Sequence, residues 1–171
     1  MVTIGDSFAV VAILGGICLS AWALMISVAL VFPSKAVNAR KRIAAKPWAS
    51  FFTGMALWLT LGILGFGMVA NPLPLAKLMG WTVVMSLLSV ASVGASGLVL
   101  LASERLRALA PEMTSYSSIA KSAAVIVTAG LVPLLGWFLV VPFLVFASTG
   151  AGLSALMQRS EATNEAPRFI P

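Results

Sequence analysis

Four long apolar runs, separated by short breaks, leave this chain few ways to fold. They cover residues of about 8–32, 49–70, 75–102 and 122–157. Each run exceeds the roughly 20 residues that an α-helix needs to cross the hydrocarbon core of a bilayer. Charged residues make up only 9% of the chain, against about a quarter in a typical globular protein. Because so few charges cannot cover a water-exposed surface, the sequence predicts an all-α integral membrane protein.

The last run, 122–157, is too long for a single crossing. As one helix it would reach about 54 Å at 1.5 Å per residue, whereas the hydrocarbon core is about 30 Å thick. Pro133 and Gly136 lie near its middle, and proline inside a helix removes a backbone hydrogen bond. We therefore predict a bundle of four transmembrane-scale helices in which the last stretch is broken into a hairpin. The expected domain is a single polytopic one, 1–157, with four to five membrane segments (8–32, 49–70, 75–102, 117–135 and 137–157) and a short polar tail, 158–171.

The segment between the first two runs, Ser34–Trp48, sets the expected orientation. It carries five Lys or Arg residues and no acidic residue. Cationic residues near the ends of membrane segments stay in the cytoplasm. We therefore expect loop 34–48 in the cytoplasm, the N-terminus outside and the C-terminus in the cytoplasm. The same cations should attract anionic lipid headgroups by about 1 kcal/mol each; they are Lys35, Arg40, Lys41, Arg42 and Lys46.

The composition also limits the chemistry that the chain can perform. The sequence has no histidine and one cysteine, Cys18, which excludes imidazole-ligated haem, the usual zinc site and histidine-based acid–base catalysis. No acidic residue lies in the middle of a predicted membrane segment, where an ionisable group would suggest a proton or ion site. The basic residues lie at segment ends rather than in one patch with aromatic residues. We expect no catalytic residue, metal, cofactor or nucleic-acid partner.

Small residues recur every three or four positions in three of the predicted helices, a spacing that allows membrane helices to pack closely. The serines of the third helix suit hydrogen bonds between helices, although a polar stripe can also line a pathway. The predicted packing residues are Ala12, Gly16 and Ser20 in the first helix, Ser89, Ser92 and Ser96 in the third, and Ala147, Ala151 and Ala155 in the last.

Several short motifs follow one another in a familiar order. Phe32-Pro33 precedes the basic segment, Lys46-Pro47-Trp48 follows it, and the turn Pro72-Leu73-Pro74 comes next; the later motifs are Leu131–Trp137 and Gly150-Ala151-Gly152. From Phe32 to Arg159 the chain resembles the polytopic membrane core of bacterial bactofilin-type (polymer-forming cytoskeletal) membrane proteins. The resemblance implies a location in the bacterial inner membrane and a scaffold or anchoring role. It implies no catalytic residues, and the soluble β-rich polymerising domain of that family is not expected here.

Two functions fit these observations. The first is a non-enzymatic inner-membrane subunit that scaffolds, anchors or stabilises a larger assembly through its small-residue helix faces, with protein partners or further copies of itself. The alternative is a small transporter or channel, with a site formed by the helix break Pro133–Gly136 and the serine stripe of the third segment. In such a site unwound backbone is tolerated inside the membrane.

Overall fold

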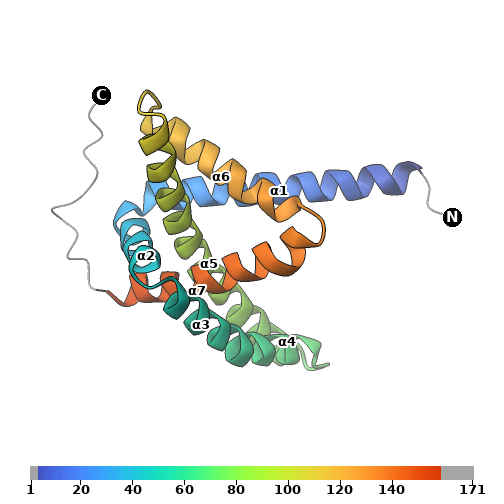
Figure 1. The fold of residues 1–171 in the computed structure, drawn as a ribbon. Coiled ribbons are helices and arrows are strands. Elements are labelled where there is room, and N and C mark those ends of the chain that lie inside the picture. The colour runs from blue at the N-terminus through green and yellow to red at the C-terminus, as the bar shows by residue number, and fades with distance from the viewer. Residues whose placement is uncertain (1–3, 159–171) are drawn as a thin grey trace.

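The computed structural model describes residues 4–158, with side chains from Phe8 onward, and these residues are almost entirely helical (Figure 1). The elements in chain order are α1 (Ile4–Val31), α2 (Pro33–Ala45), α3 (Pro47–Leu57), the π-helical segment η1 (Trp58–Gly62), α4 (Ile63–Ala70), α5 (Pro74–Leu109), α6 (Ser115–Leu131), the π-helical segment η2 (Gly136–Val140) and α7 (Val141–Met157). No strand occurs between residues 4 and 158. The predicted all-α fold class is therefore confirmed.

Four helical stretches are long and apolar enough to cross a membrane: Phe8–Val31, Pro47–Ala70, Pro74–Leu109 and Gly136–Met157. They correspond to the predicted first, second, third and fifth segments. The third is longer than the expected 75–102, because the helix continues through Glu104, Arg105 and Arg107 to Leu109. Glu and Arg are good helix formers, so charge alone did not end this helix. The predicted tail lies outside the described residues, apart from Gln158.

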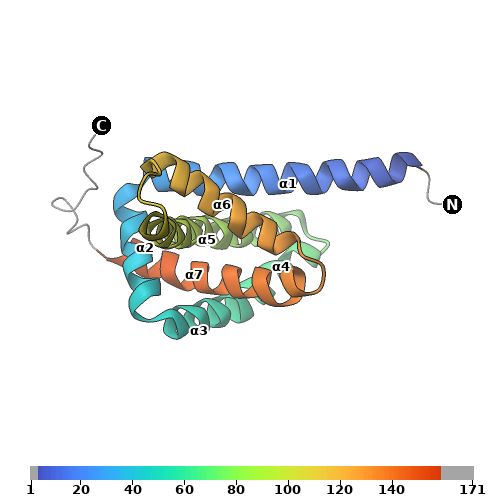
Figure 2. The ribbon, with the colours of Figure 1, turned by 45° about the horizontal axis from the view of Figure 1, so that its top comes forward.

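The prediction of a loop over 34–48 is wrong. Most of this segment is the helix α2, which crosses the end of the bundle between α1 and α3 (Figure 2). Pro33 occupies its first turn, where the missing N–H of proline costs nothing. The alanines, lysines and arginines that follow are strong helix formers. Only Phe32 separates α2 from α1, and only Lys46 separates it from α3.

The predicted break in the last apolar stretch is present. Helix α6 ends at Leu131, four residues before the expected boundary, and helical structure resumes at Gly136. Leu134 adopts φ 64°, a left-handed conformation that few residues other than glycine accept. The turn is tight, because a Cβ added at Gly136 would come within 2.5 Å of the Gly130 carbonyl oxygen. With 17 residues, α6 is about 26 Å long, shorter than the hydrocarbon core.

Helix α7 packs between α3 and α5 through direct backbone contacts. A Cβ added at Gly150 would collide with the carbonyl of Ser50 on α3, and one added at Gly152 would collide with the carbonyl of Val90 on α5. The facing positions Gly54 and Gly94 are equally close to the α7 backbone. Glycine is required at both crossings, because any side chain would force the helices apart. Ala147, Ala151 and Ala155 are buried on the same helix.

Helix α1 joins this bundle through its C-terminal half only. Ile26 packs with Val99 of α5 and with Ile119 and Ala123 of α6 in one buried apolar cluster. The indole N–H of Trp22 donates to the carbonyl of Ala120 at 3.0 Å. The N-terminal half of α1 extends past the other helices (Figures 1 and 2).

Replacing Gly150 with alanine should destabilise the fold. The added methyl group meets the α3 backbone, so we expect the free energy of unfolding to fall by about 1–3 kcal/mol. Thermal unfolding in mild detergent, followed by circular dichroism, measures this change. Gly67→Ala is the matched control, since nothing lies within 4 Å of a Cβ at Gly67. Equal stability of the two variants would contradict the close packing of α3 and α7.

Candidate functional site

The part of the chain that the structure describes contains no group of three His, Cys, Asp or Glu side chains able to hold a metal ion. Cys18 is half-buried on α1. The features that distinguish this protein are therefore its surfaces: the cationic helix α2, the polar stripe of α5 and the helix faces that carry small residues.

Helix α2 is fixed to the bundle by its apolar side. Ala36, Ala39 and Ile43 are buried, and the last two pack with Ala151 and Ala155 of α7. This arrangement places a helix rich in Lys and Arg across the ends of α5 and α7. The predicted cationic segment is thus a rigid surface and not a mobile connection.

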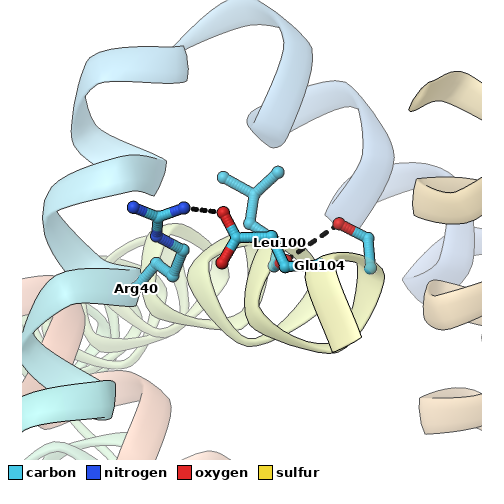
Figure 3. A network of polar contacts seen from close by, with 4 residues as sticks. Arg40, Leu100 and Glu104 are labelled. Atoms are coloured by element: carbon cyan, nitrogen blue, oxygen red, sulfur yellow. Dashed lines mark hydrogen bonds and ion pairs between the residues drawn. The ribbon is translucent and has the colours of Figure 1, made fainter. Parts of the chain in front are cut away.

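Two of the α2 cations bind the ends of neighbouring helices. The ammonium group of Lys35 donates to the carbonyl oxygens of Ala155 and Gln158, at 3.3 and 3.2 Å. These carbonyls belong to the last turn of α7, where unpaired backbone acceptors and the helix dipole favour a cation. Arg40 forms an ion pair with Glu104 on α5 (Figure 3). The hydroxyl of Ser103, the residue before Glu104, donates to the Leu100 carbonyl at 2.8 Å.

These contacts bring the C-terminal parts of α5 and α7 together with α2 on one side of the bundle. The last turn of α7 and the part of α5 from Gly97 to Glu104 lie against α2, and Arg105 and Arg107 follow in the last turns of α5. Lys77, by contrast, lies in the first turn of α5, at the opposite end of that helix. Arg105 and Arg107 therefore lie toward the same side of the bundle as α2, away from Lys77.

The other cations of the segment Ser34–Trp48 differ in their surroundings. Lys41 and Lys46 are exposed. Arg42 is half-buried, and its Nε atom is buried without a hydrogen-bond partner in the described part of the chain. Trp48, two residues beyond Lys46, is 66% exposed and lies in an aromatic cluster with Phe51, Phe52 and Phe143.

The serines of α5 do not form the expected hydrogen bonds between helices. Each hydroxyl donates to a carbonyl of its own helix: Ser89 to Met85 at 2.8 Å, Ser92 to Ser89 at 2.8 Å and Ser96 to Val93 at 2.7 Å. A helical carbonyl three or four residues back is always within reach of a serine hydroxyl. Ser96 is fully buried and acts as a small packing residue, whereas Ser89 is exposed.

An open groove of about 260 Å³ lies between α5 and the α3–η1 segment. Thr82 and Ser86 contribute its polar side chains, and the remaining lining is apolar: Leu57, Leu61, Val83, Leu87, Val90 and Leu153. The break at Pro133–Gly136 is not part of this lining.

Hydrogen bonds between helices come from residues that sequence reasoning did not identify. The indole N–H of Trp58 donates to the hydroxyl of Thr149 at 3.0 Å, and Thr149 is completely buried on α7. Trp58 begins the π-helical segment η1, and its ring lies against Gly62, within 2.9 Å of a Cβ built there. A glycine four residues after a tryptophan was the available signal.

The small-residue face of α1 has no partner in the described structure. Ala12, Gly16 and Ser20 are all exposed, and nothing lies within 4 Å of a Cβ built at Gly15 or Gly16. In the most apolar 18-residue stretch of α1, 6% of the residues are buried, whereas 39% are buried in the corresponding stretches of α5 and of Gly136–Met157. The predicted packing of this face therefore does not occur within the chain.

No protein family, curated protein or solved structure matches this chain. The geometry of the helices is therefore the basis for the function proposed below.

Replacing Trp58 with phenylalanine should weaken the α3–α7 contact. The smaller phenyl ring stays aromatic but has no N–H, so the hydrogen bond to buried Thr149 is lost and we expect a loss of about 1 kcal/mol in stability. Denaturation of the purified protein by increasing mole fractions of SDS measures it. Trp81→Phe is the control, because Trp81 is 50% exposed on α5. The role of the indole N–H is refuted if both variants unfold like the unmodified protein.

Proposed function

We propose that this protein is a non-enzymatic subunit of the bacterial inner membrane that anchors or scaffolds a larger assembly. In this proposal α1, α3–α4, α5, α6 and η2–α7 cross the bilayer, α6 with η2–α7 forms the last hairpin, and α2 lies at the cytoplasmic surface. The N-terminus is outside and the C-terminus cytoplasmic.

The contrast between two similar helix faces carries the proposal. On α7 the face Ala147, Ala151 and Ala155 is fully used within the chain. On α1 the residues with the same four-residue spacing are all exposed, and the N-terminal part of this helix extends past the bundle (Figure 2). Small residues in a membrane helix allow close approach of another helix, and association there depends on such packing. The outward face of α1 is thus where a partner helix, from another protein or a second copy, would pack.

The transporter alternative has less support. A transport site at the bilayer midplane needs unwound backbone facing a polar cavity. The groove beside α5 is mostly apolar, and the helix break lies elsewhere. The hydroxyls of Ser86 and Ser89 already donate to carbonyls of their own helix. Their hydroxyl hydrogens are therefore not available to replace the water molecules around a solute.

Gly16→Leu should abolish association without unfolding the protein. The larger side chain blocks close approach at the α1 face, while the space around Gly16 is empty within the chain. Blue-native electrophoresis and a pull-down in mild detergent should show a complex for the unmodified protein and a monomer for the variant. Gly67→Leu adds the same side chain at another exposed glycine and should leave the complex intact. An unmodified protein that is always a lone monomer would contradict the proposal.

A further inference from the structure

The connections of α2 determine where its outer face can lie. One residue, Phe32, joins it to α1, and one residue, Lys46, joins it to α3. Because such links span only about 3.5 Å each, α2 cannot move away from the ends of these apolar helices. If α1 and α3 cross a bilayer, as proposed above, α2 must lie at the boundary between hydrocarbon and water.

The cations of the segment Ser34–Trp48 differ in their surroundings. Lys35 and Arg40 are engaged by α7 and α5. Arg42 and Lys46 lie farther along, where α2 passes into α3, and no Asp or Glu occurs anywhere from Pro33 to Trp48. The buried Nε of Arg42 has no protein acceptor in the described residues. Arg42 as a whole is only half-buried, so an anion from outside the chain can reach the accessible part of its guanidinium group, and the opposite charge would offset the cost of holding this cation without an acidic partner.

We propose that Arg42 and Lys46 bind the phosphate of an anionic phospholipid of the cytoplasmic leaflet. Arginine presents a planar set of donors that matches a phosphodiester, and lysine adds a second positive charge. Trp48 is 66% exposed beside them, and an exposed tryptophan is typical of the level of the lipid headgroups. A lipid is favoured over an acidic protein because the links of α2 hold this surface at the membrane boundary.

Native mass spectrometry of the full chain, released from detergent with phosphatidylglycerol or phosphatidylcholine, tests the proposal. The unmodified protein should retain phosphatidylglycerol in preference to phosphatidylcholine. Each cation removed should weaken phosphatidylglycerol binding about fivefold, so Arg42→Gln combined with Lys46→Gln should weaken it about 25-fold. Arg42→Lys, which keeps the charge but not the planar donors, should fall between the unmodified protein and Arg42→Gln.

Lys77→Gln is the matched control, since it removes one charge at the other end of the bundle and should not change lipid retention. A melting curve for each variant verifies folding. Equal retention of both lipids by the unmodified protein would overturn the proposal, as would undiminished phosphatidylglycerol binding by the double variant. Binding of polyglutamate without binding of phosphatidylglycerol would also overturn it, in favour of an acidic protein.

This inference rests on the proposed membrane insertion but not on association through α1. Lipid retention is measured on the monomer peak, so a protein without partners can still bind phosphatidylglycerol. Conversely, loss of lipid in the double variant should leave the complex seen in native electrophoresis unchanged. The two proposals therefore fail independently.

Discussion

The short connections at the two ends of α2 constrain the rest of the structure. With single residues on either side, the end of α1, the start of α3 and the cationic helix must lie at one level. Pro33 and Pro47 occupy the first turns of α2 and α3, so each change of direction occurs where a missing N–H is tolerated. Lys35 and Arg40 then attach the ends of α7 and α5 to the same level. One short helix thereby aligns the ends of four others.

Away from that end, two kinds of contact hold the helices together. Backbone-to-backbone approaches join α7 to α3 and α5, and the Trp58–Thr149 hydrogen bond adds a directional contact. Side chains larger than glycine form the cluster that joins α1 to α5 and α6. Backbone approaches require a fixed geometry, whereas the α1 contact covers only half of a helix. These differences make the α3–α5–α7 unit the core and α1 a peripheral element with a surface for association.

The apolar segments and the hairpin break could be predicted from the sequence because length against bilayer thickness is a strong constraint. The helix over Pro33–Ala45 could not be predicted in this way, because a run of Lys and Arg between two apolar segments is typical of a connecting loop, although the same residues also favour a helix. Spacing by four identified the small faces of α1 and α7 equally well. This spacing could not show that only the α7 face is buried, because it describes one helix and not the neighbours of that helix. For the same reason the hydrogen bond of Trp58 could not be predicted, since its partner Thr149 is distant in sequence.

The central claim is that α2 and its cations lie on the cytoplasmic side, and site-directed labelling tests it most directly. In a chain with Cys18→Ser, a single cysteine is placed at Arg42 or at Asn71, in the turn between α4 and α5. A membrane-impermeant maleimide is applied to intact bacterial cells. The account predicts labelling at position 71 in intact cells and at position 42 only after lysis. Labelling at position 42 in intact cells would contradict the proposed orientation.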